Sequence, residues 1–317
     1  MTDNRRRTMP RLCKLAVAGA LIWTTLSGAV PASADSPATL PSDSLVSALA
    51  RQVALELVQG YPAELEKSVD GWIASLSARR PFAAWKTASR AIEPLGPGTH
   101  GWLVTLRSPA KQAVGYLVVY AAEDGSYRLG EYGVGPQPLF DKASLSRSLV
   151  ANGILSSHSS PYRAEKQYLH PFAAVWKVTV EGETYWFDAK TDEQLPLDDK
   201  SWARIREAFH GLSPEPDAAP AVSKLKLGEP FDPYERLPWL MNEAPFDADA
   251  DSDFVARVGQ GHPLRYVCEP FGDKMLYAIA VVGYTGWSGG RIDAALEMYG
   301  SRFVPLSTLR SYGLFYR

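Results

Sequence analysis

The apolar periodicity changes within the first half of the chain, and this change constrains the fold more than any other feature. Apolar residues recur in steps of three and four over residues 42–60 and 63–76, the spacing of amphipathic helices. Residues 82–132 instead contain short runs rich in β-branched and aromatic residues, which predict strands. Helices and sheets bury their apolar faces against each other. We therefore expect an α+β fold, with helices packed on one face of antiparallel sheets.

Strands are expected in this first block at 82–92, 101–107, 114–121 and 127–132, forming a four-stranded antiparallel sheet. Asp124-Gly125 supplies the positive φ angles of a hairpin turn between the last two. A shorter block follows, with helices at 143–151 and 201–210 and a hairpin of strands at 173–180 and 184–189. Proline-rich residues 213–220 then indicate a stiff linker.

In the last block we expect a helix at 253–258, strands at 264–269, 274–283, 291–298 and 302–305, and a final helix that Ser307 caps. The predicted organisation is a signal peptide over 1–34, a helix-and-sheet module over 35–140, a second α+β module over 141–212, a linker over 213–223 and a third module over 224–317.

The first residues have the order of a secretory leader. Basic residues from Arg5 to Lys14 precede the apolar stretch Leu15–Val30, and Ala32-Ser33-Ala34 provides the small residues that a signal peptidase needs. The apolar stretch is short for a hydrocarbon core of ~30 Å. We expect cleavage near Asp35 and a secreted or cell-envelope protein with no stable membrane span, while an uncleaved N-terminal anchor stays open.

Net charge and cysteine content limit the kinds of partner, disulfide and metal site that the protein can have. The formal net charge is −2 with a basic leader included, so the mature chain is acidic and has no electrostatic reason to bind nucleic acid. Cys268 is its single cysteine, which excludes an internal disulfide and a cysteine metal cluster. We expect no cofactor.

The middle block resembles a PepSY-type module over about residues 165–200. The strand Ala174–Val178 has a central tryptophan, and Tyr185–Ala189 runs into Lys190-Thr191, as in the family's Asp-Ala-x-Thr-Gly turn. Here Asp192 stands where the family has glycine. The resemblance implies an extracytoplasmic, non-catalytic α+β unit of the kind associated with peptidase regulation.

The last block is similar to the C-terminal half of papain-like, bacteriocin-processing-type cysteine peptidases. The resemblance rests on Gly261–Val267, Tyr277–Tyr284, Ala295–Gly300 and Arg302–Ser307. Tyr277 occupies the position of the family's catalytic histidine, and Glu297 that of the aspartate that orients it. The comparable region, Pro230 to Asp253, contains no cysteine and is too short for a full N-terminal lobe. Tyrosine, with a pKa of ~10, is no base near neutral pH. The resemblance therefore implies a truncated scaffold without the peptidase's catalytic pair.

Three residues remain candidates for catalysis: Cys268, His262 six residues before it, and Glu297. On the expected strand 264–269, Cys268 shares a face with Leu264 and Tyr266, which favours a buried structural thiol. A reactive thiol paired with His262 is the alternative.

Two further patterns suggest binding. Asp247, Asp249, Asp251 and Asp253 alternate as in calcium loops, but Ser252 and Val258 replace the glycine and glutamate of an EF-type loop. A solvated acidic loop before a helix is the other interpretation. Aromatic residues on or near expected strands would form a binding platform if they faced outward, and otherwise belong to the core: Trp102, Tyr116, Tyr120, Trp176, Tyr185, Trp186 and Trp287.

The sequence thus favours a secreted, non-catalytic binding or regulatory protein of the cell envelope. Its expected partner is an extracellular peptide, a protein or a cell-wall glycan. A thiol-dependent hydrolase using Cys268 and a calcium-dependent extracellular module are the alternatives.

Overall fold

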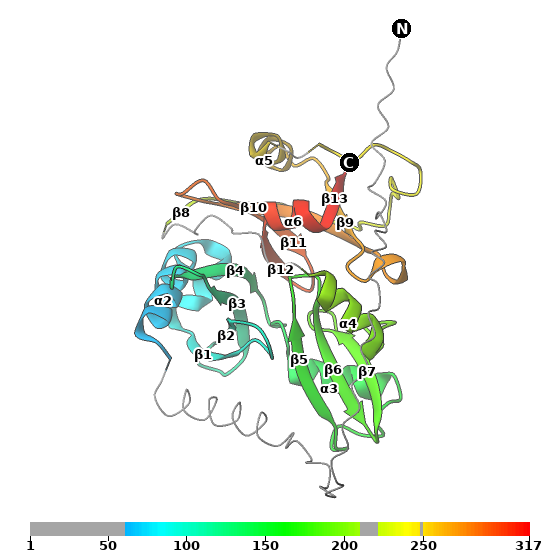
Figure 1. The fold of residues 1–317 in the computed structure, drawn as a ribbon. Helices are drawn as coiled ribbons and strands as arrows, with labels where there is room; N and C mark the ends of the chain where they lie inside the picture. The colour runs from blue at the N-terminus through cyan, green and yellow to red at the C-terminus, as the bar shows by residue number, and fades with distance from the viewer. Residues whose placement is uncertain (1–60, 210–220, 248–249) are drawn as a thin grey trace, which may run out of the picture. The chain divides into compact units, whose positions relative to one another are not determined.

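The computed structural model describes residues 61–209, 221–247 and 250–317, which form a mixed α+β protein with large antiparallel sheets (Figure 1). The α+β prediction is confirmed. The expected leader over 1–34, the helix at 42–60, the proline-rich segment 213–220 and Asp249 lie outside the described residues. No helix in the described ranges has the length and apolar character needed to cross a membrane.

The first block follows the predicted order of helix and strands. Its elements are α2 (Ala63–Ser77), the 3₁₀ helix η1 (Arg80–Thr87), β1 (Ser89–Pro94), β2 (Gly101–Arg107), β3 (Ala113–Ala121) and β4 (Tyr127–Val134). The expected strand at 82–92 is wrong in its first half. A proline opens η1, and Phe82 and Trp85 lie three residues apart and are both buried, which suits a 3₁₀ helix. Gly125 adopts the positive φ that the hairpin between β3 and β4 requires.

The middle block adds one strand that the sequence did not predict. Its elements are α3 (Lys142–Ala151), β5 (Arg163–Tyr168), β6 (Ala174–Val180), β7 (Glu183–Asp188) and α4 (Asp199–Ala208). The side chains of Asp141 and Asp198 cap α3 and α4 by accepting backbone N–H bonds. β5 pairs with β6, and the resulting sheet has the order β5-β6-β7.

The last block contains the expected strands and two more at its ends. Its elements are β8 (Val222–Leu227), α5 (Asp251–Gly259), β9 (Arg265–Cys268), η2 (Gly272–Lys274), β10 (Tyr277–Trp287), β11 (Ile292–Glu297), β12 (Ser301–Pro305), α6 (Leu306–Tyr312) and β13 (Gly313–Tyr316). The sequence did not predict β8 or β13. The final helix begins after Pro305, so Ser307 lies inside it rather than at its cap.

The first and last blocks share one sheet. Its strand order is β1-β2-β3-β4-β12-β11-β10-β9-β13, and β8 also pairs with β10. β4 joins β12 through the register pairs Gly133↔Arg302 and Tyr132↔Phe303. The prediction of a separate four-stranded sheet is therefore wrong, because β4 pairs with β12 of the last block and is not an edge strand. This pairing satisfies backbone groups that an edge strand would leave open.

The three largest hydrophobic cores are also shared between blocks. α2 packs on one face of the large sheet with Phe82 and Phe303. Val118 of β3 packs with Trp176 and Phe187 of the three-stranded sheet. A third core combines Val175 and Trp186 with β9, β10 and β11. The three-stranded sheet therefore packs against both of the other blocks.

Most of the aromatic residues considered for a platform belong to these cores. Tyr116, Trp176, Trp186 and Trp287 are buried, and Trp102, Tyr120 and Tyr185 are half-buried. The large aromatic content is thus used for packing, and these seven side chains form no outward-facing platform.

Candidate functional site

Cys268 is buried in β9, directly opposite Tyr277 of β10 in the antiparallel ladder. Burial raises the pKa of its thiol well above the ordinary value, and this effect outweighs the hydrogen bond with Tyr266. A thiol with a raised pKa holds its proton at neutral pH and is a poor nucleophile. His262 is exposed in the turn after α5, and within the described ranges no hydrogen bond joins it to Cys268.

Glu297 has a structural role at the end of β11. Its Oε1 accepts a hydrogen bond of 3.1 Å from the backbone N–H of Gly300 and so closes the turn into β12. This is the position at which the peptidase resemblance placed an orienting aspartate. Glu297, Cys268 and His262 are therefore not brought together as a catalytic group by any hydrogen bond of the described residues.

The acidic run before α5 serves that helix. Asp251 and Asp253 lie in its first turn, where negative charge favours the helix dipole. Asp251 Oδ1 also pairs with Arg310 Nη1 of α6 at 2.8 Å. Asp247 precedes the gap in the described chain, and Asp249 lies within it. In the part of the chain that the structure describes, no group of three or more His, Cys, Asp or Glu residues could hold a metal ion.

The turn after β7 is held by the carboxylate of Asp188. Its Oδ1 accepts backbone N–H bonds from Lys190 and Thr191, both at 2.7 Å. Its Oδ2 accepts a bond of 2.9 Å from the hydroxyl of Tyr277. Burial, followed by the charge of Asp188, keeps the pKa of that hydroxyl far above its usual range. The Asp188 carboxylate therefore binds the turn that follows β7 and Tyr277 of β10 at the same time.

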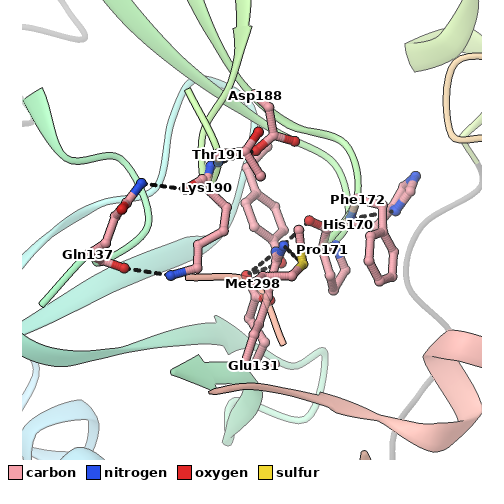
Figure 2. Close-up of polar contacts among 12 residues, drawn as sticks. Glu131, Gln137, His170, Pro171, Phe172, Asp188, Lys190, Thr191 and Met298 are labelled. Carbon is pink, nitrogen blue, oxygen red and sulfur yellow. Dashed lines mark hydrogen bonds and ion pairs between the residues drawn. The ribbon is translucent and has the colours of Figure 1, made fainter. Parts of the chain in front are cut away.

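A buried ion pair lies beside this turn. Arg302 of β12 donates from Nε to Oε2 of Glu131 at 2.6 Å and from Nη2 to Oε1 at 3.0 Å, and the two side chains are 1% and 0% exposed. Tyr168 of β5 donates to the same carboxylate at 3.4 Å, and Arg302 also donates to the carbonyl oxygen of Pro171. Figure 2 labels Glu131 and Pro171 among the residues of this network.

His170 borders this network but remains neutral. Its Nδ1 accepts the backbone N–H of Phe172 at 3.3 Å, and its ring stacks on Tyr312 with centroids 3.8 Å apart. Burial and the nearby Arg302 lower its pKa to about 3. A histidine with this pKa is a weak base.

Lys190 extends the network toward the surface. Its Nζ donates to the carbonyl oxygen of Gln137 at 2.6 Å, while the Gln137 amide donates back to the carbonyl oxygen of Lys190 at 3.0 Å (Figure 2). Burial, and then the charge of Arg302, lower the pKa of Lys190 to about 8. The turn after β7 is thus fixed both by the Asp188 carboxylate and by the reciprocal bonds between Lys190 and Gln137.

A pocket of about 360 Å³ opens beside this turn. It is lined by Gln137, Ser144, Arg147, Ser148, Ala151, Thr191, Asp192 and Tyr299. We call it the Asp192 pocket. Its walls come from α3, from the turn after β7 and from the β11–β12 turn that Glu297 shapes. The ring of Tyr299 is 62% exposed at its rim.

Asp192 is the unusual group in this pocket. Its side chain is 6% exposed, its Oδ2 lies 3.5 Å from the Gln137 amide nitrogen, and its Oδ1 is buried with no hydrogen-bond partner among the described residues. Burial raises its pKa to about 6; the nearby Asp188 and Asp141 add to this, while Ser144 and Arg147 act against it. The residue has a φ of 56°, a left-handed backbone conformation that favours glycine.

Sequence reasoning identified Asp192 only as a departure from a motif, and it missed Glu131, Arg302 and Lys190. A charged residue inside a run that otherwise predicts a buried strand was the available signal, as at Glu131 within 127–134 and Arg302 within 301–305.

No family model, no curated protein and no solved structure matches this chain. The resemblances to PepSY modules and to papain-like peptidases therefore stay predictions from short motifs.

Proposed function

We propose that this chain is an exported, non-catalytic binding protein of the cell envelope, and that the Asp192 pocket binds the free amino end of a peptide. One observation carries the proposal: a carboxylate oxygen of Asp192 is buried in the pocket wall without a hydrogen-bond partner among the described residues. Buried acceptors are almost always satisfied, so such an oxygen is suited to a donor that the ligand supplies.

The other lining groups favour an ammonium next to a carbonyl oxygen. Asp192 accepts from an ammonium, and the exposed ring of Tyr299 offers a cation–π contact at the rim. Arg147 also lines the pocket and is exposed, so it is placed to donate to a ligand oxygen. A peptide N-terminus carries both groups on adjacent atoms.

The surroundings of the catalytic candidates Cys268 and Glu297, and of the buried His170 and Tyr277, support binding rather than catalysis. The raised pKa of the Cys268 thiol, the lowered pKa of His170 and the structural bonds of Glu297 and Tyr277 leave each of these groups in a role that holds the fold. The order of basic, apolar and small residues over 1–34 supports export.

Calorimetry with tri-alanine amide tests the proposal. The peptide with a free amino end should bind, and its N-acetylated form should not. Asp192→Asn should weaken binding by about tenfold or more, because a charge-assisted hydrogen bond is lost. Asp124→Asn, in the exposed hairpin turn, is the matched control and should leave binding unchanged.

Two further measurements separate binding from folding. Asp192→Gly restores the residue that the backbone angle favours, so it should keep or raise stability while it removes binding. Binding should strengthen as the pH rises through about 6, where Asp192 ionises against the opposing charges of Asp188 and Asp141 and with the help of Arg147. Equal binding of the acetylated peptide, or full binding by Asp192→Asn, would refute the proposal.

A further inference from the structure

A second pocket, of about 250 Å³, lies between helix α4 and one face of the three-stranded sheet. Its lining residues are Glu165, Gln167, Lys177, Trp186, Asp199, Trp202, Ala203 and Arg206. Glu165, Lys177 and Trp186 form a continuous row across β5, β6 and β7, because they are register partners in the sheet. We call this site the tryptophan pocket. It shares no lining residue with the Asp192 pocket.

The carboxylates of this pocket are already paired. Asp199 Oδ2 accepts from Lys177 Nζ at 2.9 Å, and Glu165 Oε1 pairs with Arg163 Nη2 at 2.7 Å. Lys177 also lies over the ring of Trp186 at 5.6 Å from its centroid. The acceptors on the lining are therefore largely occupied by the protein's own cations.

The donors are not. The rings of Trp186 and Trp202 pack together with centroids 5.3 Å apart, and both indole Nε1 atoms are buried without a hydrogen-bond partner in the described ranges. Over the same ranges, the Arg206 guanidinium and the Gln167 amide make no hydrogen bond, and both residues line the pocket. An unsatisfied buried N–H costs free energy, which an acceptor on a ligand would recover if the two rings adjust so that it reaches the nitrogen.

We propose that the tryptophan pocket binds a carboxylate. A carboxylate presents two acceptor oxygens, carries the charge that Arg206 complements, and donates nothing to the satisfied Asp199 and Glu165. The small volume suits this group together with the adjacent residue of an extended peptide. The C-terminus of a peptide and the side chain of an acidic residue share this chemistry. The inference does not depend on the Asp192 pocket.

NMR on isotope-labelled protein tests the proposal, since the indole N–H resonances of Trp186 and Trp202 report the contact directly. Each resonance is assigned with a Trp→Phe variant. The first probe is N-acetylated tri-alanine with a free carboxylate, whose blocked amino end cannot use the Asp192 pocket. It should shift both indole resonances, and the same peptide with a C-terminal amide should not.

Substitutions on α4 provide matched variants. Arg206→Gln should weaken the binding of the free-carboxylate peptide about tenfold. Arg204→Gln changes the same charge on the same helix outside the pocket and should bind as the parent does. Asp192→Asn should also bind normally, so failure of one site is distinguishable from failure of the other.

A third probe, an N-acetylated peptide amide with a central glutamate, identifies the source of the carboxylate. Binding of this probe at least as tight as that of the free C-terminus assigns the pocket to acidic side chains. Much weaker binding assigns it to peptide C-termini, and either result supports a carboxylate site. Equal shifts with the acid and the amide forms of tri-alanine, or no indole shift with either carboxylate, would overturn the proposal.

Discussion

The hydroxyl of Tyr277 donates a hydrogen bond of 2.9 Å to Oδ2 of Asp188, across 89 positions of sequence. It joins the first residue of β10 to the turn that follows β7, and both side chains are buried. Tyr277 is therefore a buried hydrogen-bond donor that anchors the three-stranded sheet to the large one.

Tyr277→Phe should destabilise the protein by about 1–3 kcal/mol, because it leaves a buried carboxylate oxygen of Asp188 without its donor. Urea unfolding followed by tryptophan fluorescence measures the change. Tyr234→Phe removes a hydroxyl from a side chain that is 54% exposed and should have little effect. Equal stability of both variants would show that the bond to Asp188 contributes nothing.

Arg302→Met should cost more, about 3–5 kcal/mol, since it removes the cation that pairs with the fully buried carboxyl group of Glu131. The double variant with Glu131→Leu removes both charges and should recover much of the loss. Thermal and urea unfolding of the parent, the single variant and the double variant measure this. A double variant as unstable as the single one would mean that the pair is needed for more than charge balance.

The sequence predicted the α+β class and most elements because their residues follow clear periodicities. It missed β5 because Arg163–Tyr168 is mostly polar, and a strand of this kind is recognisable only from its partner β6. It also missed the pairing of β4 with β12, since β-branched residues predict a strand but not its neighbour across 169 positions of chain from Gly133 to Arg302.

The candidate sites were less accessible from the sequence than the fold. The Asp192 pocket requires α3, the turn after β7 and Tyr299 to meet, and no local pattern encodes that meeting. The resemblance to PepSY modules did single out Asp192, as a residue in the place of a glycine. The structure adds that Asp192 has a left-handed φ of 56°, which is uncommon for a residue other than glycine. The tryptophan pocket combines residues of β5, β6, β7 and α4. In the sequence, each of these residues has the pattern of an ordinary core or surface position.

The Cys268 thiol should not react with iodoacetamide in the folded protein. Burial raises its pKa and the side chain is 3% exposed, so both the thiolate and access to it are lacking. Mass spectrometry should detect the adduct only after denaturation, and His262→Ala should not change this result. Rapid native labelling that His262→Ala abolishes would instead favour the thiol hydrolase.

Lys190 should make the stability of the protein depend on pH in the mildly alkaline range. Its pKa is about 8 in the folded chain against an ordinary value of 10.5, so between these values the unfolded state binds more protons than the folded state. The free energy of unfolding therefore rises with pH through this window, because the folded chain is relieved of a buried charge.

Lys190→Met isolates this contribution. Cys268 and the buried tyrosines have raised pKa values and act in the opposite direction at high pH, but they are present in both proteins and cancel in the difference. Between pH 8 and about 10, the parent should gain about 2 kcal/mol of stability relative to the variant. Parallel pH profiles from urea unfolding would show that Lys190 titrates normally, and the burial of its ammonium between Gln137 and Arg302 would then have no energetic consequence.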